Sequence, residues 1–223
     1  MKKEILAIFA HPDDEILACG GTLIKRVSQG FDIKILILSN GCESRSQSSQ
    51  NEINHRLKSC EKASEIIGAN LLKVGEFPDN KFDSIPLLDI VKYIERNVKD
   101  IKPDEIFTHF RSDLNIDHRI TFQAVKTVFR PIFMKENSKI FECEVPSSTD
   151  WTDNFISPFS PNHYEDISLH IKKKIEALNC YNSEMRDPPH SRSYESIQNL
   201  AKFRGMHSGS NMSEAFIINF SKS

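Results

Sequence analysis

Two short segments of the chain combine the residue types that bind catalytic metal ions. Residues 10–15 read Ala-His-Pro-Asp-Asp-Glu, and residues 115–118 read Asn-Ile-Asp-His. One imidazole and one carboxylate from the first segment, with one imidazole from the second, make a His, Asp, His set of ligands. Three protein ligands with a fourth position open for water are typical of a catalytic zinc site. The same set accepts iron (Fe2+), cobalt or manganese, so it predicts a divalent metal without fixing its identity.

The acidic residues also have a simpler explanation. Asp13, Asp14 and Glu15 precede a predicted helix, where N-capping and the helix dipole favour acidic side chains. Asp117 and His118 can cap the next helix in the same way. For each segment taken alone, capping and metal binding are equally good interpretations. Capping does not explain the His-Pro dipeptide before the acids, or why both segments follow strands.

The neighbouring elements predict that the two segments meet in space. Residues 5–9 and 33–38 are short apolar runs, typical of strands buried on both faces of a parallel sheet. Residues 15–29 have apolar side chains at helical spacing and end at Gly30, which predicts a helix and a right-handed βαβ unit. Residues 105–108 are a further predicted strand. Both segments therefore lie at strand carboxyl ends, where open α/β sheets bind ligands.

Strands and helices continue to alternate along the rest of the chain. The pattern predicts a single domain over residues 1–223, an α/β Rossmann-like fold with a mainly parallel sheet and helices on both faces. Further helices are expected over 52–67, 85–98, 118–129, 171–181 and 193–204, and further strands over 71–74, 139–145 and 215–220. Residues 146–163 are rich in Pro, Ser and Asn, and a loop of that length is usually functional, for example as a substrate lid.

Charge and composition favour a small-molecule ligand. The chain has 29 Lys and Arg against 31 Asp and Glu, and its net charge of −2 gives no general attraction to nucleic acid or an anionic membrane. Five scattered cysteines without a Cys-x-x-Cys pair indicate a reducing compartment. No secretion signal or apolar stretch of roughly 20 residues is recognisable, so we expect a cytoplasmic protein without a membrane span. Periodicity leaves open whether the protein is a homo-oligomer.

A longer pattern surrounds the first segment. Residues 10–15 are followed by Gly20-Gly21-Thr22, and the combination resembles the signature of the PIG-L, or LmbE-like, family of zinc-dependent de-N-acetylases. The resemblance extends over nearly the whole chain, with further matching positions at Arg56, Gly68 and residues 78–80, 117–119, 204–205 and 214–216.

The resemblance implies a role for each residue of the site. By motif position His11, Asp14 and His118 are the metal ligands, and Asp13 is the general base. The implied reaction removes an N-acetyl group from an amino sugar or amino-sugar conjugate. A metal-bound carboxylate stays ionised, whereas an unbound one can take a proton from the metal's water and pass it to the leaving amine. Of the two adjacent aspartates, Asp14 would therefore bind the metal and Asp13 would transfer the proton.

The second segment departs from the family pattern. Many members have His-x-Asp-His there, whereas this chain has Asn115 two residues before Asp117, and we expect both to be catalytic residues. Asn can donate a hydrogen bond but carries neither charge nor a transferable proton. Either Asp13 then handles both proton transfers, or His109 or His207 contributes. The default interpretation of either histidine is an ordinary packed or surface residue.

Several other residues are candidates for substrate binding. Arg56 and Asp79 match family positions that reach sugar hydroxyls, and such a pair can hold a polyol by hydrogen bonds. A solvated helix face is an equal alternative for Arg56. Trp151 and Phe155 can stack on a pyranose ring or anchor the long loop. Glu43 matches a position where the family often has an acidic residue, although a turn role is favoured there.

Three functions are compatible with these residues. We expect a metal-dependent deacetylase of a small amino sugar or its conjugate, with zinc as the cofactor. An inactive sugar-binding protein on the same scaffold is the main alternative, although the intact set of His11, Asp13, Asp14 and His118 argues against it. Phosphoester hydrolysis is a third function, but it commonly uses two metals about 4 Å apart, and the sequence offers ligands for one.

Overall fold

The first strand of the structure shows why its sequence is apolar throughout. In β1 (Glu4–Phe9), Ile5 and Phe9 pack into a hydrophobic cluster on one face of the sheet, and Leu6 and Ile8 pack into a second cluster on the other. Successive side chains of a strand point to opposite faces. A strand buried on both faces therefore needs an unbroken apolar run.

The computed structural model describes residues 2–42, 49–153 and 155–222. In these residues, six α-helices alternate with the strands of one seven-stranded sheet, and short 3-10 turns lie between them. The other strands are β2 (Asp32–Ile37), β3 (Asn70–Val74), β4 (Glu105–His109), β5 (Lys139–Cys143), β6 (His163–Asp166) and β7 (Ser213–Ser221). The helices are α1 (Asp14–Ser28), α2 (Gln50–Ile67), α3 (Leu87–Val98), α4 (Ile116–Val128), α5 (Ile171–Asn179) and α6 (Tyr194–Ser208).

The strand order places the two metal-type segments side by side. The order is β3-β2-β1-β4-β5-β7-β6, with β1 to β5 parallel and β7 antiparallel to both of its neighbours. The direction of winding reverses between β1 and β4, which are adjacent strands. The carboxyl ends of strands at such a switch point border the crevice in which open α/β sheets bind ligands.

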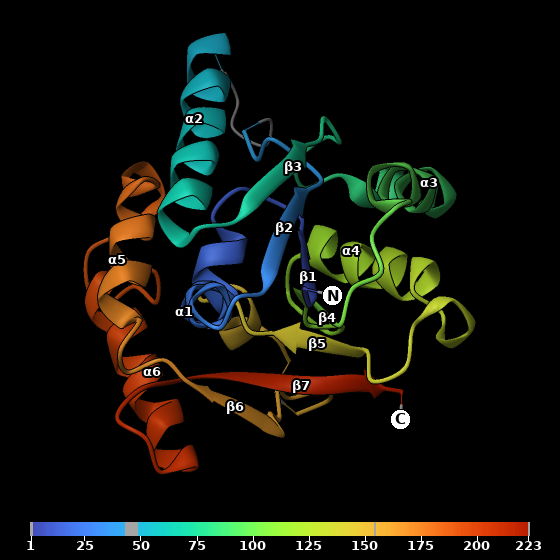
Figure 1. Cartoon of the computed structure of the whole chain (residues 1–223). Helices are drawn as coiled ribbons and strands as arrows, with labels where there is room; N and C mark the ends of the chain where they lie inside the picture. Colours follow the sequence, from blue (N-terminus) through green and yellow to red (C-terminus); the bar gives the residue numbers. More distant parts are fainter. Residues whose placement is uncertain (1, 43–48, 154, 223) are drawn as a thin grey trace.

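Helices cover both faces of the sheet, as the sequence predicts (Figure 1). The first cluster joins the sheet to α1, α2 and α5, for example through Leu23, Cys60 and Leu178. The second joins it to α3 and α4 through Ile90 and Val125. The predicted α/β fold with a mainly parallel sheet is confirmed.

The ends of the elements follow local sequence signals, but the sequence did not predict one of the strands. Gly68 closes α2 in the left-handed conformation, with φ of 84°, where a residue without Cβ is favoured. β6 begins at the last residue of the segment that we expected to be a loop. It has four residues, His163–Asp166, and pairs with β7. Its sequence, His-Tyr-Glu-Asp, lacks the apolar alternation that identifies a strand.

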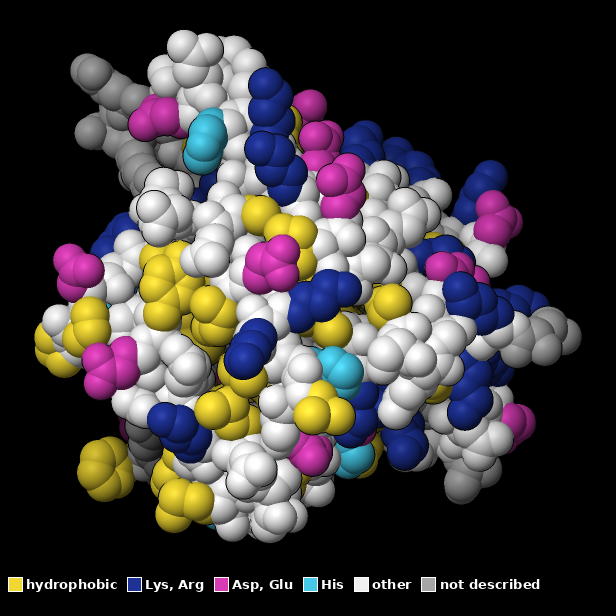
Figure 2. Space-filling model, turned by 60° about the vertical axis from the view of Figure 1, so that its left-hand side comes forward, with side chains coloured by type: hydrophobic (Ala, Val, Ile, Leu, Met, Phe, Trp, Pro, Cys, Tyr) yellow, Lys and Arg dark blue, Asp and Glu magenta, His cyan; other side chains and the backbone are white. Residues whose placement is uncertain are grey.

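The surface agrees with the balanced composition. Figure 2 turns the side of α2 and α5 towards the viewer, and basic side chains are interspersed there with acidic ones. Among the described residues, no helix is both long enough and apolar enough to cross a membrane.

Candidate metal centre and active site

Three side chains from the two predicted segments meet at the carboxyl ends of β1 and β4. His11 follows β1, Asp14 begins α1, and His118 lies in the first turn of α4. Their potential ligand atoms lie within 4.8 Å of one another. Asp14 Oδ2 is 3.2 Å from His11 Nδ1 and 3.3 Å from His118 Nε2. The exposed fractions are only 7%, 0% and 1%, respectively, so the group is shielded from water.

Two atoms of this group lack a hydrogen-bond partner among the described residues. They are Asp14 Oδ1 and His118 Nε2, and both are buried. Leaving a buried polar atom unpaired costs about 1–3 kcal/mol, so such atoms usually have a functional explanation, of which a bound ion is one. Two imidazoles and a carboxylate are also the donor set of catalytic zinc sites. The residues therefore fit a divalent metal.

Each imidazole has a carboxylate at its other nitrogen. His11 Nε2 lies 3.0 Å from Asp117 Oδ2 and 3.2 Å from Asp79 Oδ1. His118 Nδ1 lies 3.1 Å from Asp113 Oδ1. Such partners hold a ligating imidazole in the correct tautomer and orientation. His11 Nδ1 and His118 Nε2 are then left to face the metal position.

A second group of potential ligands consists of His11, Asp79 and Asp117. It shares His11 with the first group. The Asp117 carboxylate already accepts hydrogen bonds from the backbone N–H of Asn80, at 2.7 Å, and of Phe82, at 3.0 Å. These contacts suit a carboxylate that orients His11, and they leave the first group as the better metal site.

Asp13 lies next to this group but points elsewhere. Its carboxylate is 3.0 Å from Arg192 Nη1 and 3.3 Å from Arg56 Nη2, and the residue is 1% exposed. Asp13 is the N-cap residue of α1, but its side chain makes no capping hydrogen bond to the described residues. Capping therefore does not explain why an acidic residue stands at this position. Burial raises the pKa of Asp13, and the two guanidinium groups oppose that rise. A carboxylate with a raised pKa suits proton transfer near neutral pH.

Comparison with known proteins identifies the family. The PIG-L family, described as GlcNAc-PI de-N-acetylase, matches residues 6–129, which is more than half of the 223-residue chain. The chain belongs to the PIG-L family. The uncharacterized deacetylase YaiS of Escherichia coli K12 is 27% identical over 188 residues, which cover 82% of this chain and 92% of YaiS.

Two further proteins that resemble this chain have names that give different activities. The diacetylchitobiose deacetylase of Thermococcus kodakarensis is 25% identical over 223 residues, covering 95% of this chain and 81% of that protein. The crystal structure of GalB, the 4-carboxy-2-hydroxymuconate hydratase of Pseudomonas putida KT2440, is 16% identical and has a TM-score of 0.78 over 99% of this chain and 98% of its own. The second likeness concerns the fold alone, and it shows that the fold does not determine the reaction.

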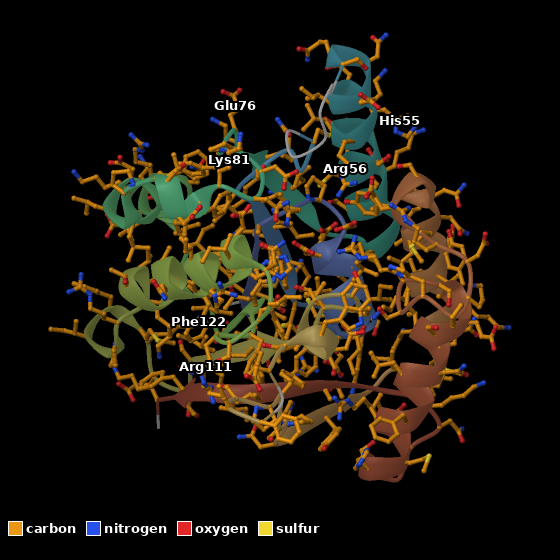
Figure 3. The ribbon with its side chains drawn as sticks, turned by 180° about the vertical axis from the view of Figure 1, so that it is seen from behind. His55, Arg56, Glu76, Lys81, Arg111 and Phe122 are labelled. Carbon is orange, nitrogen blue, oxygen red and sulfur yellow. The ribbon has the colours of Figure 1, made fainter. Side chains whose placement is uncertain are left out.

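The two PIG-L positions expected to bind sugar are both almost buried. Arg56 is 7% exposed, so the solvated helix face considered for it is wrong. In Figure 3 it points from α2 into the molecule, whereas His55 points outward. Arg56 Nη2 donates to the Pro12 carbonyl at 2.7 Å, and Nη1 forms an ion pair with Glu184. Asp79, 3% exposed, lies beside His11.

Asn115 is used structurally in the PIG-L fold. It is the N-cap of α4, and its Oδ1 accepts a hydrogen bond from the backbone N–H of Asp117 at 2.8 Å. Its Nδ2 donates to Asn80 Oδ1 at 3.3 Å. The cap of α4 is therefore Asn115 rather than Asp117 or His118, and the second N–H of its amide is left for an oxyanion contact.

The two candidate histidines lie in different environments. His109 is fully buried, stacks on His118 with ring centroids 3.7 Å apart, and accepts the backbone N–H of Ala10 at Nε2. Burial, with His118 close by, lowers the pKa of His109, so its imidazole is neutral. His207 is exposed on α6, where its ring contacts Phe203. Only His109 is placed in the site.

Sequence reasoning missed the support that three residues give to the site. Asp113 holds His118, and Arg192 reaches Asp13 from a loop 179 positions further along the chain. Glu15 accepts the backbone N–H of Asp13 at 3.0 Å, and burial raises the pKa of Glu15 to about 8. Asp113 could have been noticed as an acid in the second loop, whereas no local signal marks Arg192.

The long loop contacts the site through two of its residues, and a role as a substrate lid stays a prediction. Ser148 and Thr149 donate hydrogen bonds to Asp113, the partner of His118. The side chains of Trp151 and Phe155 lie further out, 55% and fully exposed, respectively. Glu43 lies outside the described residues.

Proposed function

We propose that the protein is a metal-dependent hydrolase that removes the N-acetyl group of an amino sugar or amino-sugar conjugate. The observation that carries this proposal is the pairing of a buried His11, Asp14 and His118 group with an adjacent carboxylate, Asp13, that takes no part in it. Membership of the PIG-L family and the names of the deacetylase relatives support the same reaction.

His11, Asp14 and His118 would hold the metal, with Zn2+ as the first candidate and Fe2+ as the alternative. A bound metal supplies Lewis acidity, which polarises the acetamide carbonyl and lowers the pKa of a water molecule. Asp117 and Asp113 keep the two imidazoles oriented.

Asp13 carries the proton transfers in this proposal. As general base it takes a proton from the attacking water, and as general acid it delivers that proton to the sugar nitrogen when the C–N bond breaks. The products are acetate and the free amine. Arg56 and Arg192 fix the position of the Asp13 carboxylate. The sugar contacts of Arg56 and Asp79, and an oxyanion contact from Asn115, remain predictions.

The direct test is acetate release from a panel of N-acetylamino sugars by protein of known metal content. Release should stop when the metal is removed by a chelator and return when zinc is added. Asp13→Asn should bind zinc normally and release acetate about 10²–10⁴-fold more slowly, the usual worth of a general base. Asp89→Asn, at an exposed position in α3, is the matched control and should behave as the wild type.

Two outcomes would contradict the proposal. Metal-loaded wild type that releases no acetate from any member of a broad panel would argue against a deacetylase. Equal sugar affinity in the wild type and Asp13→Asn, with turnover in neither, would instead favour the inactive sugar-binding protein.

A further inference from the structure

Arg192 lies between the proposed general base and solvent. Its Nη1 donates to Asp13 Oδ2 at 3.0 Å, and its Nε donates to Ser147 Oγ at 2.6 Å and to the Pro146 carbonyl at 3.3 Å. The Arg192 side chain is 20% exposed, against 1% for that of Asp13. Arg192 Nη2 makes no hydrogen bond to the described residues. The guanidinium is therefore firmly held, and part of its donor capacity is unused.

The two residues before Arg192 also have polar atoms without a partner. His190 Nδ1 accepts the backbone N–H of Arg192 at 3.0 Å, so the ring carries its proton on Nε2, which has no partner in the described part of the chain. Ser191 Oγ is buried and likewise unpaired among the described residues. Arg192 and His190 thus keep unused hydrogen-bond donors in a loop whose Arg192 contacts Asp13, whereas the unpaired Ser191 Oγ is closed off from solvent.

An aromatic ring borders the same turn. The ring of Trp151 lies 5.6 Å from that of His190 in an edge contact, and Trp151 is 55% exposed. It comes from the long loop, whose Ser148 and Thr149 bind Asp113 next to His118. An exposed aromatic face beside polar donors suits a ligand that is partly apolar and partly charged.

Two carboxylates near Ser191 already have partners. Ser191 lines a cavity of about 220 Å³ with Glu144 and Asp150. Glu144 pairs with Arg204 at 2.6 and 2.8 Å, and Asp150 accepts the backbone N–H of Ser148 at 2.9 Å. Within the described residues, the carboxylate that contacts Arg192 is that of Asp13. An anion that approaches the outer side of Arg192 therefore meets free donors of a permanent cation.

We propose that Arg192, with His190 and Trp151, forms a subsite for an anionic group, a phosphate or a carboxylate, carried by the sugar substrate. This inference rests on the proposed function and names the substrate class as an anionic derivative of an N-acetylamino sugar. Arg192 would hold Asp13 with Nη1 and one anion oxygen with Nη2, a charge-assisted hydrogen bond.

The first experiment compares substrates that differ only in charge. Acetate release by the zinc-loaded chain is measured with methyl N-acetylglucosaminide, N-acetylglucosamine 1-phosphate, UDP-N-acetylglucosamine and a glycoside bearing a carboxylate. We expect kcat/KM to be about tenfold to a hundredfold higher for the preferred anionic sugar, the effect of one hydrogen bond to a charged group. The ranking of the three anionic sugars distinguishes sugar phosphate, nucleotide and carboxylate.

Variants separate this role from support of Asp13. Arg192→Gln should lower kcat/KM more for the anionic sugar than for the neutral one, so that the preference disappears. Arg186→Gln is the matched control, since Arg186 lies in the same loop and its guanidinium donates to the carbonyls of Ser183 and Met185. It should keep the preference. Equal losses for charged and neutral sugars in Arg192→Gln would overturn the proposal.

A binding measurement makes the result independent of turnover. Trp151 is the only tryptophan of the chain, so its fluorescence reports on this subsite. Glucosamine 1-phosphate should change the fluorescence at concentrations at least tenfold lower than glucosamine does, and Arg192→Gln should abolish that difference. This result without acetate release from any sugar would support the subsite while contradicting the deacetylase. Equal titration by both sugars would overturn the subsite.

Discussion

Replacement of Asp113 by Asn tests whether the support of His118 matters for metal binding. Asp113 Oδ1 faces His118 Nδ1 at 3.1 Å, and the carboxylate also accepts from Ser148, Thr149 and the backbone N–H of Asn115. Although burial opposes ionisation, the protonated His118 of the metal-free chain and the hydrogen bonds from His118, Ser148 and Thr149 hold the pKa of Asp113 at about 2. The carboxylate is therefore ionised at neutral pH, and when a metal takes Nε2 it would keep the remaining imidazole proton on Nδ1.

An amide at this position changes the tautomer of His118. Asn has the same shape, but its NH2 group can face Nδ1, which moves the imidazole proton to Nε2, the nitrogen that faces Asp14. A protonated Nε2 cannot ligate a metal. Loss of such a supporting partner typically weakens metal binding 10–100-fold, or about 1.4–2.7 kcal/mol. Asp113→Asn should therefore bind zinc 10–100-fold more weakly than the wild type.

The assay is competition for zinc with a chromophoric chelator at pH 7.5. Ser148→Ala is the control, because it removes one donor to Asp113 but leaves the carboxylate on His118. It should retain most of the affinity. Urea denaturation of the metal-free proteins shows whether Asp113→Asn is folded. A folded Asp113→Asn protein with wild-type zinc affinity would refute the role assigned to Asp113.

Three further predictions concern stability. Lys174→Met should lower the free energy of unfolding by about 3–5 kcal/mol in urea denaturation, because it leaves the buried Glu214 without its ion-pair partner at 2.7 Å, whereas the exposed Lys173→Met should have little effect. Asn115→Ala should lower the free energy of unfolding by about 1 kcal/mol, since α4 loses its N-cap. Although burial opposes ionisation, hydrogen bonds from His163, Arg26 and Lys25 hold the pKa of Glu165 well below its usual range. The ionised Glu165 should therefore contribute its full stabilisation of the fold above about pH 4.3, and this contribution should be lost as the pH falls below that value. The difference in free energy of unfolding between the wild type and Glu165→Gln should accordingly shrink in acid.

Local patterns were sufficient to predict the core of the fold. The apolar run of β1, the helical spacing of α1 and the stop at Gly68 are properties of short segments, and the structure agrees with each within a few residues. The meeting of His11 with His118 was also predictable, because parallel strands present their carboxyl ends at one edge of the sheet.

Contacts between distant segments were not predictable from spacing. Arg192 meets Asp13 only because the loop before α6 folds back over the ends of β1 and β5, and no periodicity encodes that path. β6 forms because β7 offers an edge, not because its own residues favour a strand. The sequence likewise could not show that Arg56 and Asp79 are buried among protein partners.

The backbone around Asp13 shows how two adjacent carboxylates can be given different tasks. Asp13 has φ of 108°, a conformation that a residue with a side chain rarely adopts and that costs energy. Its N–H is held by Glu15, and the preceding Pro12 carbonyl is held by Arg56. These contacts maintain a turn in which Asp14 points to the histidines while Asp13 points to the arginines. In an ordinary helical start, both carboxylates would be drawn to the free N–H groups of the first turn, so the strained turn is what makes a ligand and a separate base available from consecutive residues.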